Sequence, residues 1–122
     1  MELDREQVLE RFLLYSGEDG ETASPERKAL WEALCEGGAK WAEAQAGPGA
    51  AGWEESLVGL AAAQAFYHLV LVDGALLPGS LSTPEVKLDW AAREEKARAL
   101  AQEQRRLCGP VLRDGDFYFG RA

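Results

Sequence analysis

The sequence predicts a mostly α-helical fold, a small bundle of three to four helices around one central apolar helix. A minor β-strand or hairpin element is expected near the C-terminus. The central helix is predicted by residues 57–73, LVGLAAAQAFYHLVLVD, the most apolar run in the chain. Amphipathic helical patterns flank this run on both sides. The length of 122 residues and the apolar content of 47% suit a single domain, 1–122, with its own core.

The first helix is predicted over about residues 4–15. Asp4 followed three residues later by Gln7 is typical of a capping box, and Ser16-Gly17 would end the helix. No basic region is followed by an apolar one, so we expect no signal peptide. The apolar face of this helix is expected to comprise Leu3, Val8, Leu9, Phe12 and Leu13.

The second helix is predicted over residues 25–46. Ser24 can cap it, and Pro25 is favourable at the first helical position. Gly37 and Gly38 interrupt the pattern, and each costs about 1 kcal/mol relative to alanine inside a helix. They indicate a kink or a close helix crossing, with a hinge as the alternative.

The central helix is predicted over residues 53–73, with Gly74 as its left-handed cap. Gln64, Tyr67 and His68 fall on the side away from the apolar face. The apolar run is shorter than the roughly 20 residues of a comfortable membrane span, so we expect a buried helix and no membrane association. The apolar face comprises Leu57, Val58, Ala61, Ala62, Ala65, Phe66, Leu69 and Val70.

Residues 83–90 can be read in two ways. Thr83-Pro84-Glu85 could cap a helix, whereas the residues from Glu85 to Trp90 alternate between polar and apolar, which is typical of a strand. We favour an extended segment over about 81–88, followed by a helix over 89–108 that Gly109-Pro110 ends. Within that helix, Glu94 and Arg98 would pair on the surface. Its inward residues would be Ala97, Leu100, Ala101 and Leu107.

The C-terminal segment, 110–122, contains the aromatic run Phe117-Tyr118-Phe119 after a turn at Asp114-Gly115. Three adjacent aromatic residues near a chain end are expected to be buried or to bind something. They could pack on this domain as a strand beside Val86 and Leu88, or dock on a neighbouring chain.

The net charge of −8 lies entirely in the N-terminal half, because residues 1–56 hold 13 acidic and 5 basic residues. The carboxylates of the first helix and of the loop after it are interpreted as a solvated face. Such a field repels DNA and favours a basic partner. Specific nucleic-acid binding is not expected, since phosphate contacts need clustered lysine and arginine.

The residues that could support catalysis are few. His68 is the only histidine, which excludes a two-histidine metal site, and no nucleophile triad or glycine-rich phosphate loop is present. Cys35 and Cys108 are far apart in the sequence and are expected to be reduced and partly buried. The sequence therefore predicts neither an enzyme nor a cofactor or metal.

Several features follow one another in a distinctive order. An acidic N-terminal helix precedes ALCEGGAKW, the loop GPGAAGWEES and the helix AAAQAFYHLV. PEVKL, an Arg/Glu-rich helix and the ending GPVLRDGDFYFGRA follow. This order resembles that of the small proteins encoded in phage and prophage structural clusters, and is similar to head–tail connector (adaptor) proteins. The resemblance covers most of the chain.

The resemblance implies a non-enzymatic protein that assembles as a ring between portal and tail, in the virion or in the bacterial cytoplasm during assembly. Its partners would be further copies of itself and phage portal or tail-completion proteins. Residues 81–88 and the C-terminal segment would bridge subunits. An acidic face would let DNA pass through such a ring without sticking. The implied interface residues are Val86, Leu88, Val111, Leu112, Phe117, Tyr118 and Phe119.

Two other functions fit the same residues. A monomeric acidic binding protein, of the immunity-protein or anti-repressor type, would mask a basic surface and would use the acidic N-terminal half. A small-molecule-binding bundle would need a sizeable cavity beside Gln64, Tyr67 and His68.

Overall fold

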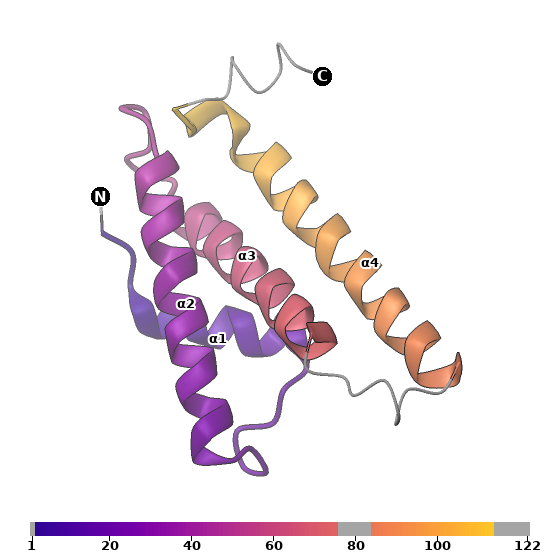
Figure 1. The fold of residues 1–122 in the computed structure, drawn as a ribbon. Coiled ribbons are helices and arrows are strands. Elements are labelled where there is room, and N and C mark those ends of the chain that lie inside the picture. The colour runs from indigo at the N-terminus through magenta and orange to yellow at the C-terminus, as the bar shows by residue number, and fades with distance from the viewer. Residues whose placement is uncertain (1, 76–83, 114–122) are drawn as a thin grey trace.

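The computed structural model describes residues 2–75 and 84–113, and these residues form a bundle of four α-helices and one short 3₁₀ helix (Figure 1). Helix α3 lies in the middle and contacts the other three helices, while α1 and α2 also contact each other. Helix α4 runs antiparallel to α3 along one side of it (Figure 1). The prediction of a central apolar helix is confirmed. The elements are α1 (Arg5–Ser16), α2 (Pro25–Gln45), α3 (Glu54–Ala75), α4 (Pro84–Cys108) and η2 (Gly109–Val111).

Helix α3 is buried on more than one side. All eight residues of the predicted apolar face are buried, and Gly59, Leu60 and Ala63 are buried as well. The helix has 22 residues and would be long and apolar enough to cross a membrane by length and composition. Most of its apolar stretch is instead covered by the neighbouring helices, as expected for the core helix of a bundle.

The first two helices begin where their capping residues predict. An Asp4 carboxylate oxygen accepts hydrogen bonds from the backbone N–H groups of Glu6 and Gln7, at 2.9 and 3.4 Å. The Ser24 hydroxyl oxygen accepts one from the N–H of Arg27 at 3.1 Å. These bonds satisfy N–H groups that have no partner inside the helix.

Helix α2 runs without a break through Gly37 and Gly38, as the single helix predicted over 25–46 requires, and of the two readings of these glycines the structure supports the close crossing. A Cβ atom added to Gly38 would lie 2.5 Å from the carbonyl oxygen of Ala61 on α3. A Cβ atom added to Gly37 would meet nothing within 4 Å. Only Gly38 is therefore required by the packing of α2 on α3.

Gly74 does not end α3, which continues to Ala75, and its backbone is not left-handed. Its role is to make room for Trp90, because an added Cβ would lie 2.3 Å from the indole ring. The indole N–H of Trp90 donates a hydrogen bond to the carbonyl oxygen of Val70 at 2.9 Å. The space beside Gly74 therefore lets Trp90 hold the first part of α4 against the end of α3.

Helix α4 begins at Pro84, so the predicted extended segment is wrong over residues 84–88. Residues 81–83 lie outside the described residues. Proline is favourable at the first position of a helix because its backbone is already in the helical conformation. The short polar–apolar alternation over 85–90 does not prevent helix formation here, because the same helix continues for 20 further residues after 88. Ala97 faces the core as predicted, whereas Leu107 is 47% exposed.

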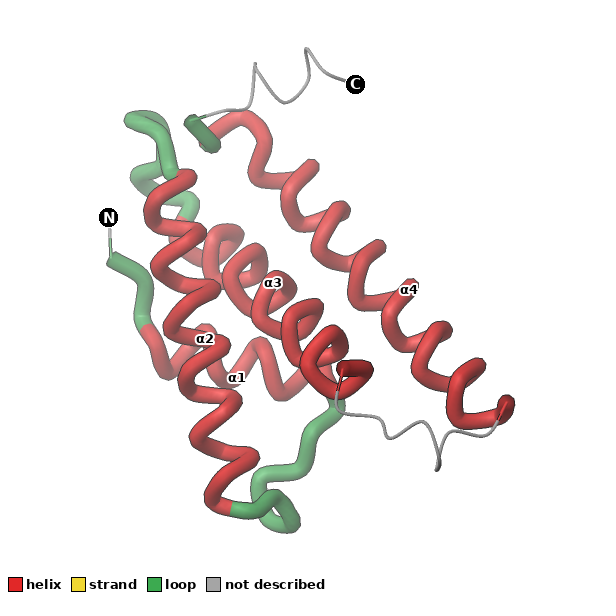
Figure 2. The backbone as a smooth tube through the Cα atoms, viewed as in Figure 1, coloured by secondary structure: helices red, strands yellow, loops and turns green. Residues whose placement is uncertain are grey.

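No β-strand occurs in residues 2–75 or 84–113, so the predicted strand element is not supported in this part of the chain (Figure 2). The nearest feature is an isolated antiparallel bridge between Ala46 and Leu112. The backbone N–H of Gly47 donates to the carbonyl of Val111 at 2.7 Å, and that of Arg113 donates to Gln45 at 2.6 Å. These bonds join residues 111–113 to the end of α2.

The two adjacent glycines of α2 provide a matched test of the crossing. Gly38→Ala should lower the free energy of unfolding by about 1–3 kcal/mol, because the added methyl group meets the α3 backbone. Gly37→Ala should leave it unchanged or raise it by up to about 1 kcal/mol, because alanine favours the helix. Urea unfolding followed by circular dichroism measures both, and equal stabilities would contradict the close crossing.

Candidate functional site

The predicted interface residues that the structure describes lie at two separate ends of α4. Leu88 is 70% exposed near the start of α4 and Val86 lies in the first turn of that helix, whereas Val111 is buried after its end. The intervening helix separates these two ends by roughly 30 Å. Leu112 is half-buried at the end of α2. The aromatic residues Phe117, Tyr118 and Phe119 lie outside the described residues.

The C-terminal end of the described chain is attached to the bundle at one point. Arg113 donates from its side-chain Nε to the carbonyl oxygen of Ala46 at 3.0 Å, besides its backbone bond to Gln45. A shallow depression of about 770 Å³ adjoins this point. Its lining includes Glu2, Glu54 and Arg113. The attachment fixes the position from which the chain continues beyond Arg113.

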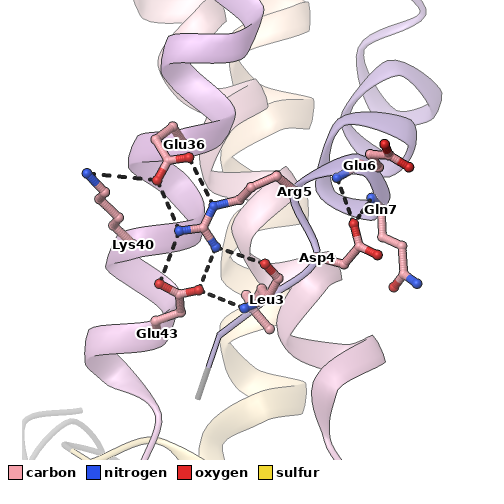
Figure 3. A network of polar contacts seen from close by, with 8 residues as sticks. All are labelled: Leu3, Asp4, Arg5, Glu6, Gln7, Glu36, Lys40 and Glu43. Atoms are coloured by element: carbon pink, nitrogen blue, oxygen red, sulfur yellow. Dashed lines mark hydrogen bonds and ion pairs between the residues drawn. The ribbon is translucent and has the colours of Figure 1, made fainter.

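Arg5 joins the N-terminal end of the chain to α2 (Figure 3). Its guanidinium donates to both carboxylate oxygens of Glu36 at 3.0 Å and to Glu43 at 2.5 Å. Glu43 also accepts from the backbone N–H of Leu3 at 2.7 Å. The hydrogen bonds from Arg5 hold the pKa of the Glu36 and Glu43 carboxyls below their ordinary values. Lys40, four residues after Glu36 on the same helix, lies 3.8 Å from it.

A second cluster, the Arg27 cluster, is formed by Arg27, Glu18, Asp73, Arg93 and Trp31. Arg27 binds both oxygens of Asp73 on α3 at 2.7 and 2.9 Å, and its Nε donates to Glu18 at 2.7 Å. Arg93 of α4 donates to Asp73 at 3.2 Å, and the Trp31 indole donates to Glu18 at 3.3 Å. The cluster therefore connects α2, α3, α4 and the loop after α1.

The Arg27 cluster was not predicted from the sequence. Glu18 was interpreted as part of a solvated acidic face, but its side chain is only 21% exposed. Partial burial would raise the pKa of the Asp73 carboxyl, yet the hydrogen bonds and charges of Arg27 and Arg93 outweigh it and hold that pKa below its ordinary value. The sequence offered one signal for this cluster, the acidic residue Asp73 at the end of the apolar run of the central helix.

Gln64, Tyr67 and His68 lie on the uncovered side of α3. The Gln64 Nε2 and His68 Nε2 atoms are 3.3 Å apart at the surface, and His68 is exposed. A hydrogen bond with Tyr67, and then the charge of Glu94, raise the pKa of the Arg98 guanidinium. The predicted Glu94–Arg98 ion pair is confirmed, although Glu94 is only 15% exposed. Among these groups only His68 and Arg98 are exposed.

Both cysteines are reduced and buried, which confirms that part of the prediction. Burial raises the pKa of the Cys35 thiol to about 12 and also raises the pKa of Cys108. A thiol with a raised pKa is a poor nucleophile, because the thiolate is the reactive form. Neither cysteine therefore has the surroundings of a catalytic residue.

The described residues contain no group of three or more His, Cys, Asp or Glu side chains that could hold a metal ion. Among the same residues, every buried polar side-chain atom has a hydrogen-bond partner. Salt bridges and caps thus account for the buried polar groups.

No protein-family model matches this chain, and no curated protein or solved structure resembles it significantly. The resemblance to connector proteins therefore rests on the order of sequence features alone. Four-helix arrangements serve many unrelated functions, so the fold class by itself does not select one.

Asp73→Asn tests the Arg27 cluster. At pH 7 it should lower the free energy of unfolding by about 2 kcal/mol, because two arginines lose a charged acceptor. The Asp73 pKa is lower in the folded state, so its stabilisation is present above the unfolded pKa and is lost as pH falls through the folded pKa. The difference from wild type in urea unfolding should therefore shrink below about pH 4.

Glu32→Gln is the matched control for this substitution, since Glu32 is exposed on α2 and outside the Arg27 cluster. It should change the stability by less than about 0.5 kcal/mol. A loss in Asp73→Asn that stays constant down to pH 2 would show that Asp73 does not act through its charge.

Burial of the thiols predicts slow reaction with an aromatic disulfide reagent at pH 8. Both cysteines should react at least about a hundredfold more slowly in the native protein than in urea, because exposure and ionisation are both reduced. Absorbance of the released thiolate measures the rates. Reaction of one thiol at the unfolded-state rate would contradict its burial.

Proposed function

We propose that this protein is a non-enzymatic assembly protein of the head–tail connector type, which joins other components of a phage particle. The observation that carries the proposal is the attachment of residues 111–113 to the end of α2. Contacts between the backbone of these residues and Gln45, Ala46 and Gly47 support it. This attachment fixes Arg113, the last residue that the structure describes, at the end of α2.

The sequence after the attachment point supports a binding role for this end. Phe117, Tyr118 and Phe119 follow Arg113 within six residues, so they start from a fixed base. Aromatic side chains are frequent energetic anchors of protein interfaces. Attachment of the base lowers the conformational entropy that an anchoring segment loses when it binds.

Helix α4 supports a connecting role because its two ends offer separate contacts. Leu88 is 70% exposed near its start, while residues 111–113 follow its end. A helix of 25 residues is about 37 Å long, which keeps the two contacts apart. A subunit that joins two neighbours needs two such separated surfaces.

The surface charge is compatible with a position beside DNA. Asp19 and Glu21 are exposed in the loop after α1, and Glu6 and Glu10 are exposed on α1 itself. Like charge keeps DNA from adhering to a channel wall. Glu18 is not part of this surface, since it belongs to the Arg27 cluster.

The test is affinity capture from the source bacterium after prophage induction, with mass spectrometry of the bound proteins. The intact chain should capture portal, capsid or tail proteins. Replacement of Phe117, Tyr118 and Phe119 by alanine should reduce this capture at least tenfold, whereas Arg121→Ala in the same segment should not. Capture of these proteins that is indifferent to the aromatic residues would contradict the anchoring role.

A second function is favoured by the exposed carboxylates of α1. An acidic binding protein that masks a basic surface would use Glu6 and Glu10, which face solvent. In the same experiment such a protein would capture one basic toxin or regulator. That capture would survive the aromatic substitutions and would be lost on charge reversal of Glu6 and Glu10, which would replace the connector proposal.

A further inference from the structure

The two halves of helix α4 are buried to different extents. Among the described side chains of residues 84–96 none is fully buried, and only Trp90, Arg93 and Glu94 are half-buried. In the second half Ala97 and Cys108 are fully buried. Because burial of apolar surface is the main favourable term in packing a helix, the first half is held less strongly. We name residues 84–96 the α4 arm.

The α4 arm extends past the end of α3. Trp90 lies against Gly74, and α3 ends one residue later, at Ala75. Since α4 runs antiparallel to α3, the residues before Trp90 have no turn of α3 beside them (Figure 1). The described side chains among them are all exposed, namely Glu85, Lys87, Leu88 and Asp89. This part of the arm therefore gains little from packing.

In the part of the chain that the structure describes, hydrogen bonds from the α4 arm to α3 come from two side chains. The Trp90 indole N–H donates to the carbonyl oxygen of Val70 at 2.9 Å. Arg93 donates to Asp73 at 3.2 Å, and its guanidinium lies 5.6 Å from the centre of the Phe66 ring. The position of the arm thus depends mainly on Trp90 and Arg93.

The acceptor for Arg93 is held in place from the other side of α3. Arg27 of α2 binds both carboxylate oxygens of Asp73 at 2.7 and 2.9 Å and also binds Glu18. These bonds do not involve α4. The Arg27 cluster therefore keeps Asp73 oriented whether or not Arg93 is bound to it, and the arm can leave without disturbing the contact between α2 and α3.

The second half of α4 is attached by contacts of a different kind. The Cys108 thiol donates to the Ser56 carbonyl oxygen at 3.4 Å, and the Arg105 guanidinium lies 5.3 Å from the Trp41 ring. Val111, just after the helix, is buried, and its carbonyl accepts from the N–H of Gly47 at 2.7 Å. Buried side chains and backbone hydrogen bonds thus fix this end of α4 to both α2 and α3.

We propose that the α4 arm is a separately opening segment, which detaches from α3 by local unfolding while helices α1–α3 and the second half of α4 stay folded. Segments with few buried contacts open at a lower free energy than the core. Opening removes the cover that Trp90 and Arg93 provide over Val70 and Phe66, and it moves the exposed Leu88 with the arm. The inference goes beyond the proposed function and does not rest on it, because it concerns the chain alone.

Hydrogen exchange of the full chain under native conditions, followed residue by residue by NMR, tests the opening. The amides of residues 91–96 should be at least about a hundredfold less protected than those of residues 102–108 and 60–70. Fraying of the helix end alone would affect only its first turns. Equal protection of 91–96 and 102–108 would therefore overturn the proposal.

The two glycines of α2 show whether the arm opens independently of the core. Gly38→Ala weakens the crossing of α2 and α3, so exchange at residues 60–70 should accelerate about tenfold or more, while exchange at 91–96 should stay unchanged. Gly37→Ala is the matched control and should accelerate neither group. If Gly38→Ala accelerates 91–96 by the same factor as 60–70, the arm opens only with the whole molecule and the proposal is wrong.

Low concentrations of urea give the same distinction without a substitution. Exchange through global unfolding accelerates steeply with urea, because much surface is exposed, whereas local opening exposes little. Exchange at 60–70 should therefore depend strongly on urea and exchange at 91–96 only weakly. Equal dependence at both groups would contradict a separate opening.

Substitutions in the arm test the contacts that hold it. Arg93→Gln should accelerate exchange at 91–96 about tenfold, because the ion pair with Asp73 and the contact with Phe66 are lost. Lys96→Gln is the matched control, since Lys96 is exposed on the same arm, and it should change the exchange less than about twofold. Equal effects of the two substitutions would show that Arg93 does not hold the arm.

Discussion

Helix α2 crosses α3 where Gly38 faces the carbonyl oxygen of Ala61, and the two backbones meet there without an intervening side chain. The neighbouring residues at the crossing are also small, with Ala39 and Ala42 of α2 fully buried and Ala65 of α3 beside Gly38. Because the two backbones approach closely, the crossing is stabilised by many small dispersion contacts and not by the packing of a few large side chains. The positions of α1 and α4 depend on this pair, because both pack on α3.

Salt bridges act at the places where helices meet at the surface. Arg5 joins the N-terminal end of the chain to α2, and Arg27 joins the start of α2 to the end of α3. Each arginine binds two carboxylates, so much of the basic charge of the N-terminal half is engaged inside the molecule. The carboxylates of Glu6 and Glu10 on α1 face solvent instead.

Helix α4 differs from the other helices in how little of it is covered. Of its described side chains only Ala97 and Cys108 are fully buried, and Trp90 and Arg93 hold its first half against α3. A ring contact between Arg105 and Trp41, 5.3 Å apart, connects its second half to α2. A long helix fixed along one side leaves its other side available for partners. The connector proposal uses its two ends.

The start of the first two helices, the apolar face of α3 and the burial of both thiols could be predicted from the sequence. Caps act on N–H groups two or three residues away, and periodicity reports which side of a helix is apolar, so both are local properties. The same reasoning failed at residues 84–88, where a short alternation resembled a strand. The outcome there was decided by the continuity of α4 and by the fit of Trp90 over Gly74.

The candidate surfaces were less predictable than the helices. Leu88 was expected at an interface and is exposed, but the burial of Val111 depends on the end of α2, far away in the sequence. Identical neighbouring residues, Gly37 and Gly38, acquire different roles for the same reason. The sequence by itself determined most of the helical segments and the apolar face of α3, because those are set by near neighbours. Only the tertiary structure decided which charges pair and which leucines stay exposed, because these depend on elements that meet in space.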